Sequence, residues 1–421
     1  MPTTGVHIRR AAFSVYVTFF VVGFIFANWA ARLPAIRDEL EFSASQMGRL
    51  LLVGAIGSLL ALPTSGWIVQ KLGGQKTIIA SATLMVGGYA LAATTLGDLP
   101  IAVTAAGLLL GGIGMGICDA AMNLEGTRVE NAAQRALMPR FHGMFSLGTM
   151  AGALASALVE IVSLSVAVHM GIALLLGYVL IVNATRNLLA PKHTISHVSL
   201  DTTTETHTQP QRSVWSAWKE KQTWMIGFVV LAAALTEGAA NDWLSLAIVD
   251  GFEVSKALGA FGLFVFLTAM TITRMVGTKL LDMYGRIVVL RICSLCAFTG
   301  LALFGLAPWL WLALVGALLW GAGAALGFPM GMSAASDEPE HAAARVSVVA
   351  TIGYAAFFAG PPILGELAHH VGYRHALLAI MIPVLVGLLI VRAVEERGVA
   401  AQAFAARKQA RTVGSAPSET K

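Results

Sequence analysis

Two carboxylates lie inside long apolar runs of this chain, where a charge is costly. Asp119 follows the run Gly111-Gly-Ile-Gly-Met-Gly-Ile-Cys118, and Glu237 lies well inside the run 223–245. On insertion scales an ionised acid at the centre of a bilayer costs roughly 2.5–3.5 kcal/mol. Because the neutral acid avoids this cost, Asp119 could carry a proton across the membrane. The alternative is that Asp119 caps or bonds a neighbouring helix near its end.

Amides and indoles accompany these acids. Asn241 stands four residues after Glu237, a spacing that places both side chains on one helix face. Amides and carboxylates pair with hydroxyl groups, and the apolar face of a sugar ring stacks on an indole. The residues expected to contact such a solute are Asn28, Trp29, Asn123, Glu237, Asn241, Asp242 and Trp243.

Two of these assignments have a specific alternative, and one histidine adds a second proton candidate. Asp242 and Trp243 lie nearer the end of their run, where an interfacial aromatic belt would also place them. His142 opens the run 141–162, and an imidazole can relay protons near neutral pH. A histidine at a helix end that only bonds a carbonyl group is the alternative. Glu160 lies near a helix end and is expected to be solvated.

The elements that must position these residues are apolar all round. Hydrophobic residues make up 57% of the 421 residues and charged residues 12%, whereas a globular chain carries roughly 25% charged residues. About twenty apolar residues span a hydrocarbon layer of ~30 Å. We therefore predict an all-α membrane protein with twelve transmembrane helices, at residues 11–31, 47–69, 77–96, 100–123, 141–162, 166–188, 223–245, 258–279, 286–305, 308–331, 346–368 and 373–393.

Polar stretches divide these runs into two sets of six. Residues 191–222 include Asp201-Thr-Thr-Thr-Glu-Thr-His-Thr-Gln-Pro and have no apolar periodicity, which is typical of a flexible linker. The predicted organisation is a six-helix bundle over 1–190, a cytoplasmic linker over 191–222, a second six-helix bundle over 223–394 and a cytoplasmic tail over 395–421.

The basic residues predict the orientation. With the N-terminus inside, most lysines and arginines fall in cytoplasmic segments, as the positive-inside rule requires. We therefore expect both termini in the cytoplasm and explain the net charge of +5 by the membrane rather than by nucleic acid. The basic residues expected on the opposite side are Arg32, Arg37, Arg49, Lys256 and Arg374.

The two halves repeat one another. Gln70 and Gly73 follow the second run as Asp282 and Gly285 follow the eighth. The further matched positions are Arg140 with Arg345, Gly148 with Gly353, and the ladder Gly112-Ile-Gly114 with Gly321-Ala-Gly323. Duplicated halves suit an alternating-access transporter whose site lies between them at the midplane.

At these residues the chain resembles the major facilitator superfamily. The loop after the second run is similar to the family's Gly-x-x-x-Asp-Arg-x-Gly-Arg signature, but Gln70 and Gly74 depart from it. The copy after the eighth run keeps the acid, the glycine and the arginine. In the family this loop helps set the conformational equilibrium, and an arginine eight residues earlier packs near it. The resemblance implies gating roles for Gln70, Gly73, Arg274, Asp282, Gly285 and Arg286.

A closer resemblance is to the bacterial inner-membrane YbjJ-like and MosC-like group. The stretches that carry it begin with Trp29-Ala-Ala-Arg32-Leu-Pro34-Ala-Ile-Arg37-Asp38, and the others are Phe141-His142-Gly-Met-Phe-Ser-Leu-Gly148, Glu237-Gly-Ala-Ala-Asn241-Asp242-Trp243, Gly327-Phe-Pro329 and Arg345 to Gly353. More distantly, Asp119-Ala-Ala-Met-Asn123 resembles the Glu-x-x-x-Asn of fucose–proton symporters. Those symporters also carry an acid near the end of their first span, where this chain has Ala30.

These patterns predict a secondary active transporter. We expect proton-coupled uptake of a sugar, polyol or cyclitol across the bacterial inner membrane by a monomer. The alternative is a proton-antiport exporter of a metabolite or drug, because the same carboxylates would serve it. The sequence holds no HExxH, GxSxG or P-loop motif, so we expect neither an enzyme nor a primary pump. No cofactor or metal is expected. The expected partners are lipid, a small solute and protons, and no nucleic acid.

Overall fold

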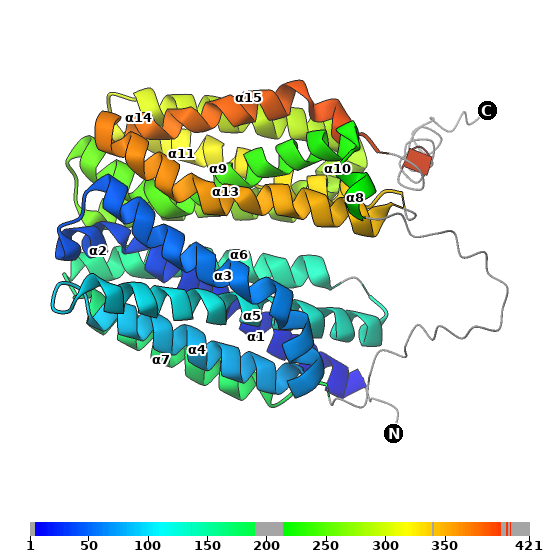
Figure 1. The fold of residues 1–421 in the computed structure, drawn as a ribbon, viewed down its shortest axis with the longest axis horizontal. Coiled ribbons are helices and arrows are strands. Elements are labelled where there is room, and N and C mark those ends of the chain that lie inside the picture. The colour runs from blue at the N-terminus through cyan, green and yellow to red at the C-terminus, as the bar shows by residue number, and fades with distance from the viewer. Residues whose placement is uncertain are drawn as a thin grey trace, which may run out of the picture. The chain divides into compact units, whose positions relative to one another are not determined.

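Every regular element in the described part of the chain is a helix. The computed structural model describes residues 5–135, 137–189, 214–338, 341–396, 401–402 and 405 (Figure 1). The predicted all-α class is confirmed for these residues. Residues 191–213 of the predicted linker and most of the predicted tail lie outside them.

The chain divides into two units that each combine several segments. Unit 1 holds the described residues of Met1–Glu205, Ala239–Leu267 and Pro361–Ala376. Its complete helices are α1 (Gly5–Ala31), α2 (Leu33–Leu40), α3 (Ala44–Leu72), α4 (Gly74–Thr94), α5 (Ile101–Ala133), α6 (Met138–Ile161) and α7 (Val166–Thr185). Within this unit α5 packs on α3 and α4, and α1 packs on α6 and α7 (Figure 1, blue to cyan).

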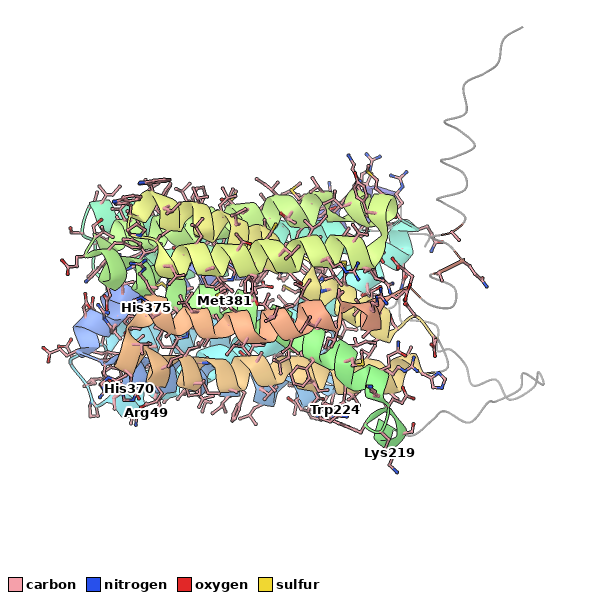
Figure 2. All side chains as sticks on the ribbon, turned by 90° about the horizontal axis from the view of Figure 1, so that it is seen from above. Arg49, Lys219, Trp224, His370, His375 and Met381 are labelled. Atoms are coloured by element: carbon pink, nitrogen blue, oxygen red, sulfur yellow. The ribbon has the colours of Figure 1, made fainter. Side chains whose placement is uncertain are left out.

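Unit 2 holds the described residues of Thr206–Gly238, Thr268–Gly360 and Leu377–Lys421. Three long helices, α9 (Lys221–Phe252), α10 (Lys256–Leu306) and α13 (Ala342–Val371), contribute to both units. The helix α14 (Tyr373–Leu377) crosses the boundary between the units at its last residue. The remaining elements are α8 (Val214–Ala217), α11 (Leu310–Ala324), α12 (Gly327–Ala335), the 3₁₀-helices η1 (Leu378–Ile380) and η2 (Val391–Val394), and α15 (Met381–Leu389). In Figure 2 Lys219 and Trp224 lie at the end of this unit where α8 joins α9.

Ten helical segments of the described residues are long and apolar enough to cross a membrane. They coincide with predicted runs, with three differences. The predicted run 373–393 is represented by the shorter apolar helix Tyr373–Leu389, which is not among the ten. The predicted runs 258–279 and 286–305 form the single element α10, inside which Gly285 leaves helical geometry at φ 76° and ψ 167°. The predicted run 308–331 is interrupted after α11, because Ala325 and Leu326 separate it from α12.

Glycines let neighbouring helices approach until their backbones touch. A Cβ at Gly88 of α4 would overlap Gly111 of α5, and one at Gly114 would overlap Met85. Small residues at this crossing therefore allow close helix packing. The same arrangement recurs between α10 and α11, where a Cβ at Gly300 would overlap the backbone of Trp320. The internal repeat thus extends from sequence landmarks to packing.

Candidate transport site and gates

Asp119 lies on an exposed face of α5. Its side chain is exposed, whereas Cys118 beside it is buried. The Asn123 amide donates to the Asp119 carbonyl at 2.9 Å and to its Oδ1 at 3.3 Å. The four-residue spacing joins the acid and the amide on one helix face. Because one helical turn of backbone holds them together, they can present a joint carboxylate–amide surface to a solute or to water.

His142 stands at the beginning of α6 and is also exposed. Its ring packs edge-on against Phe19 of α1, with the ring centroids 5.3 Å apart. Its assignment to proton transfer remains a prediction.

Asn28 and Trp29 at the end of α1 are both enclosed within unit 1. Asn28 is fully buried, donates to the Phe24 carbonyl at 2.8 Å, and accepts from the Ser156 hydroxyl of α6 at 3.1 Å. Trp29 is 7% exposed and packs on Tyr89 of α4 with the centroids 5.3 Å apart. In this conformation Asn28 joins α1 to α6, so a solute would reach its amide only after a rearrangement of that contact.

Glu237 of α9 forms an ion pair with Arg274 of α10. The Arg274 Nη2 donates to the Glu237 Oε2 at 2.7 Å, and the two side chains are 24% and 22% exposed. Both predicted site residues are thus brought together, although sequence reasoning had placed one in substrate binding and the other in gating. This partly exposed ion pair lies inside apolar spans. Because each charge has an opposite partner, the free energy required to place either charge in the membrane is lower.

Arg274 also forms a hydrogen bond at the interruption between α11 and α12. The Arg274 Nε donates to the Ala325 carbonyl at 3.1 Å. A carbonyl at the end of a helix has no intrahelical partner, so the guanidinium replaces the missing donor. In unit 2 Arg274 therefore links α9, α10 and the break at Ala325. Near this break, the buried Trp320 indole donates to the Thr236 carbonyl at 3.1 Å.

The remaining residues of the predicted polar face continue along α9 into unit 1. Asn241 is 8% exposed and Asp242 is half-buried. Trp243 is 1% exposed and packs on Tyr373 with the ring centroids 5.7 Å apart. A buried indole does not fit the alternative of a lipid-facing aromatic belt. Among the described residues its Nε1 has no hydrogen-bond partner.

The two copies of the signature loop share a backbone turn but differ in charge contacts. Gly73 and Gly285 have φ of 78° and 76°, in the left-handed region that glycine adopts without strain. In the second copy Arg286 donates to both carboxylate oxygens of Asp337, at 2.6 and 2.9 Å. Asp282 is half-buried and Gln70 is exposed.

In the first copy the space of the missing arginine is filled from α5. A Cβ at Gly74 would overlap the carboxylate of Glu125, a side chain that is 1% exposed. Arg128 donates to the Glu125 Oε1 at 2.5 Å. The N-terminal half therefore keeps a charge contact at this loop, but both partners come from one helix. Sequence reasoning missed Glu125, for which Gly74 was the available signal.

A buried ion pair connects the end of α1 to α6. Arg32 is 2% exposed, lies 2.8 Å from Glu160 and donates to the Leu164 carbonyl at 2.7 Å. The expectation that Glu160 is solvated was wrong, because its side chain is only 9% exposed. Burial lowers the pKa of Arg32, and the charge of Glu160 opposes that shift.

The short helix α2 carries a cluster of charges that sequence reasoning also missed. Arg37 pairs with Asp250 at the end of α9, and its Nη2 donates to the Asp38 Oδ1 at 2.7 Å. Lys256 at the beginning of α10 lies 2.8 Å from Asp38. The Arg37 guanidinium also lies 5.8 Å from the ring centroid of Tyr373. We call Arg37, Asp38, Asp250 and Lys256 the α2 cluster.

Hydrogen bonding dominates the protonation of the α2 cluster. Burial alone would lower the pKa of Arg37, but hydrogen bonds to Asp250 and Asp38 raise it. Burial alone would raise the pKa of Asp38, but hydrogen bonds from Lys256 and Arg37 hold it below its ordinary value. Arg37 and Asp38 are therefore both charged at neutral pH. A surface pocket of about 460 Å³, lined by Arg37, Asp250 and Tyr373 among others, brings water to it.

A second charge cluster lies in unit 2, where α8 leads into α9. Arg345 of α13 donates to Glu220 at 2.7 Å and to Glu338 at 3.0 Å. Although burial opposes the shift, the bond from Arg345 holds the pKa of Glu220 below its ordinary value. Among the described residues, no group of three or more histidine, cysteine, aspartate and glutamate side chains could hold a metal ion.

The family and its relatives agree with this architecture. Residues 13–361 match the model of the Major Facilitator Superfamily. An uncharacterized MFS-type transporter of Yersinia pestis is 30% identical over 84% of this chain and 88% of its own length. The membrane protein MosC of Rhizobium meliloti is 26% identical over 93% of this chain and 92% of its own.

Solved structures show the same fold. The nucleoside transporter NupG matches with a TM-score of 0.70 and 15% identity, over 92% of this chain and 100% of that one. An Escherichia coli fucose:proton symporter, FucP, matches with a TM-score of 0.58 and 14% identity, over 92% and 98%. The predicted resemblance is confirmed: this chain belongs to the Major Facilitator Superfamily and is a multi-pass membrane transporter, not an enzyme.

Proposed function

We propose that this protein is a proton-coupled secondary transporter that takes up a small polar solute by alternating access. The observation that carries the proposal is the exposed carboxylate of Asp119 on an apolar membrane helix, bonded to Asn123. An exposed carboxylate on this helix is costly if it faces lipid, so it belongs in a water-filled path. Such a group can bind a proton from one side and release it to the other.

The depth of Asp119 fits this role. It stands eighteen residues after Ile101, the first residue of α5, which at 1.5 Å per residue corresponds to about 27 Å along the helix. This places the acid toward the inner side of a ~30 Å hydrocarbon layer if α5 begins at the outer surface. A proton taken up from outside would be released at this level into the cytoplasm. His142, exposed at the beginning of α6, is the proposed second proton carrier.

The solute contacts are assigned to the polar residues of α9 together with Asn123. Glu237, held by Arg274 at 2.7 Å, can accept a hydroxyl proton, and Asn241 stands one helical turn further along. Hydroxyl-rich solutes satisfy carboxylates, amides and guanidinium groups without adding a charge that the membrane would oppose. Asn28, Trp29, Asp242 and Trp243 would join them when the outer part of the protein rearranges.

The solutes of the structural neighbours favour the same solute class. One is a fucose:proton symporter and another is a nucleoside transporter. Both names denote hydroxyl-bearing solutes, and the first denotes proton coupling. Their similarity to this chain supports the fold, and the exposed acid supplies the argument for coupling.

The proposed topology has twelve crossings, both termini in the cytoplasm and a location in the bacterial inner membrane. The 51 residues of α10 would measure about 76 Å as one helix, more than twice the hydrocarbon thickness. The break at Gly285 therefore divides α10 into two crossings. The two-bundle division at 1–190 and 223–394, the monomeric state and the gating roles of Gln70, Gly73, Arg274, Asp282, Gly285 and Arg286 belong to the same proposal.

Binding and transport can be tested in sequence. Thermal unfolding of the purified protein is measured against sugars, polyols and inositol derivatives, since a ligand of the folded state raises its apparent stability. A hit is then followed in energised vesicles with and without an uncoupler. We expect uptake that the uncoupler abolishes. Outward movement would support proton-antiport export instead, and uptake that ignores the uncoupler would refute proton coupling.

Two variants assign the residues. Asp119→Asn should abolish the coupled uptake and leave the melting temperature within about 2 °C, while Asp98→Asn in an exposed loop is the matched control. Glu237→Gln should lower the affinity for the solute at least about tenfold, a difference of ~1.4 kcal/mol in binding free energy, and should therefore reduce the thermal stabilisation by the solute. Coupled uptake that survives Asp119→Asn, or binding that survives Glu237→Gln, would remove the respective residue from the site.

A further inference from the structure

The α2 cluster joins segments that lie far apart in the chain. Arg37 and Asp250 are separated by 213 residues, and Asp38 bonds both Arg37 and Lys256. Within unit 1 these contacts tie α2 to the turn between α9 and α10. All four side chains lie outside the apolar cores of the spans, on the side to which the positive-inside rule assigns few basic residues. The basic residues Arg37 and Lys256 on this side therefore have a structural role, because they form ion pairs between helix ends.

A helix crossing next to the cluster is closed by glycines. A Cβ at Gly48 of α3 would lie 2.5 Å from the Pro361 carbonyl oxygen of α13, and one at Gly365 would lie 2.7 Å from the Ala44 oxygen. The two backbones are thus in direct contact in unit 1. Beside this crossing, the Ser45 hydroxyl donates to the Glu366 Oε2 at 2.6 Å. Figure 2 shows Arg49, His370 and His375 at this same end of the unit.

We propose that the α2 cluster and the Gly48–Gly365 crossing together form a reversible outer lock, with Arg37 as its hub. The proposal rests on the alternating-access function and the orientation proposed above. When the lock is engaged, the outer ends of α9, α10 and α13 are held against α2 and α3. Admission of a solute from outside requires that these contacts separate.

The chemistry of the lock suits repeated opening. The Arg37 side chain is 15% exposed, while Asp38, Asp250 and Lys256 are between 35% and 40% exposed. Each of these partly exposed ion pairs is weak, because water competes for the charged groups. Water in the adjacent pocket can solvate the separated charges, so opening leaves no bare charge in an apolar environment. The charged hydrogen bonds to Arg37 have defined directions, so they fix how the helix ends meet in the closed state. Apolar contacts alone do not fix this geometry.

The lock is tested by the accessibility of Ser45, which is 8% exposed. The reporter Ser45→Cys is placed in a background in which Cys118, Cys293 and Cys296 are replaced by alanine. Intact cells are treated with a membrane-impermeant maleimide, and the labelling rate is measured. Arg37→Gln and Asp250→Asn are each added to this background. Glu253→Gln, an exposed acid in the same turn as Asp250, is the matched control.

We expect Arg37→Gln and Asp250→Asn to raise the labelling rate about fivefold, since the loss of a partly exposed ion pair shifts a two-state equilibrium by up to this order. Glu253→Gln should leave the rate within twofold. Unchanged labelling in both cluster variants would overturn the lock, and so would an equal increase with Glu253→Gln. If either variant fails to fold, Lys256→Gln takes its place. Labelling that rises only in inverted vesicles would leave the lock standing and refute the proposed orientation.

The glycine crossing is tested separately. Gly365→Ala should also raise the labelling rate, because its methyl group would force α13 away from the Ala44 carbonyl. Gly87→Ala is the control, since nothing lies within 4 Å of a Cβ at Gly87. Labelling that does not differ between these two variants would remove the crossing from the lock.

Discussion

The ion pair between Glu237 and Arg274 permits a quantitative prediction. Arg274→Gln removes a charged bond of 2.7 Å to Glu237 and a bond of 3.1 Å to the Ala325 carbonyl. A hydrogen bond to a charged group contributes about 1.5–3 kcal/mol and a neutral one about 1 kcal/mol. Because the pair keeps 24% and 22% of its exposure, we take the lower end and expect a loss of about 2–3 kcal/mol in the free energy of unfolding.

Glu237→Gln should cost less, about 1–2 kcal/mol, because a glutamine oxygen still accepts from the guanidinium. The double variant should lose about 2–3 kcal/mol rather than the sum of the single losses, because the shared contact disappears only once. Unfolding of the purified protein in detergent, followed by tryptophan fluorescence against denaturant, measures all three. Arg291→Gln, an exposed arginine of α10, is the control. Strict additivity would refute the interaction between the two charges.

Three further predictions follow from individual contacts. Gly74→Ala should lower the free energy of unfolding by at least ~1–3 kcal/mol, measured by denaturant titration, because its methyl group displaces the carboxylate of Glu125. Because the folded pKa of Asp38 is held below its ordinary value of 3.8, its contribution is complete above that value and is lost as the pH falls below it. Labelling at Ser45→Cys, measured relative to a free thiol at the same pH because maleimide reacts with the thiolate, should therefore increase only below about pH 4. Trp320→Phe should cost about 1–2 kcal/mol of thermal stability, because it removes the hydrogen bond from the buried indole to the Thr236 carbonyl.

Much of the fold was predictable because a membrane imposes its pattern on every helix. Each span needs a long apolar run whatever its neighbours are, so hydropathy located ten spanning segments directly. The break at Gly285 falls between the predicted runs 258–279 and 286–305, and its left-handed backbone is one that favours glycine. The interruption at Ala325 was not, because the residues around it are apolar and only the bond from Arg274 reveals why the helix can stop there.

The site was predictable in composition but not in pairing. Asp119 and Asn123 are four residues apart, so their contact follows from helix geometry alone. Arg32 and Glu160 are 128 residues apart, and the sequence around either residue does not predict that they form an ion pair. The expectation of a solvated Glu160 failed for this reason.

The sequence by itself determined which segments enter the membrane, which family the chain resembles and which acids lie at membrane depth, because each depends on local composition or spacing. The tertiary structure decided which charges compensate one another: Arg274 with Glu237, Arg128 with Glu125, and Arg37 with Asp250. The physical reason is that a charge accepts any opposite partner within about 4 Å. Only the packing of distant helices selects which partner arrives there.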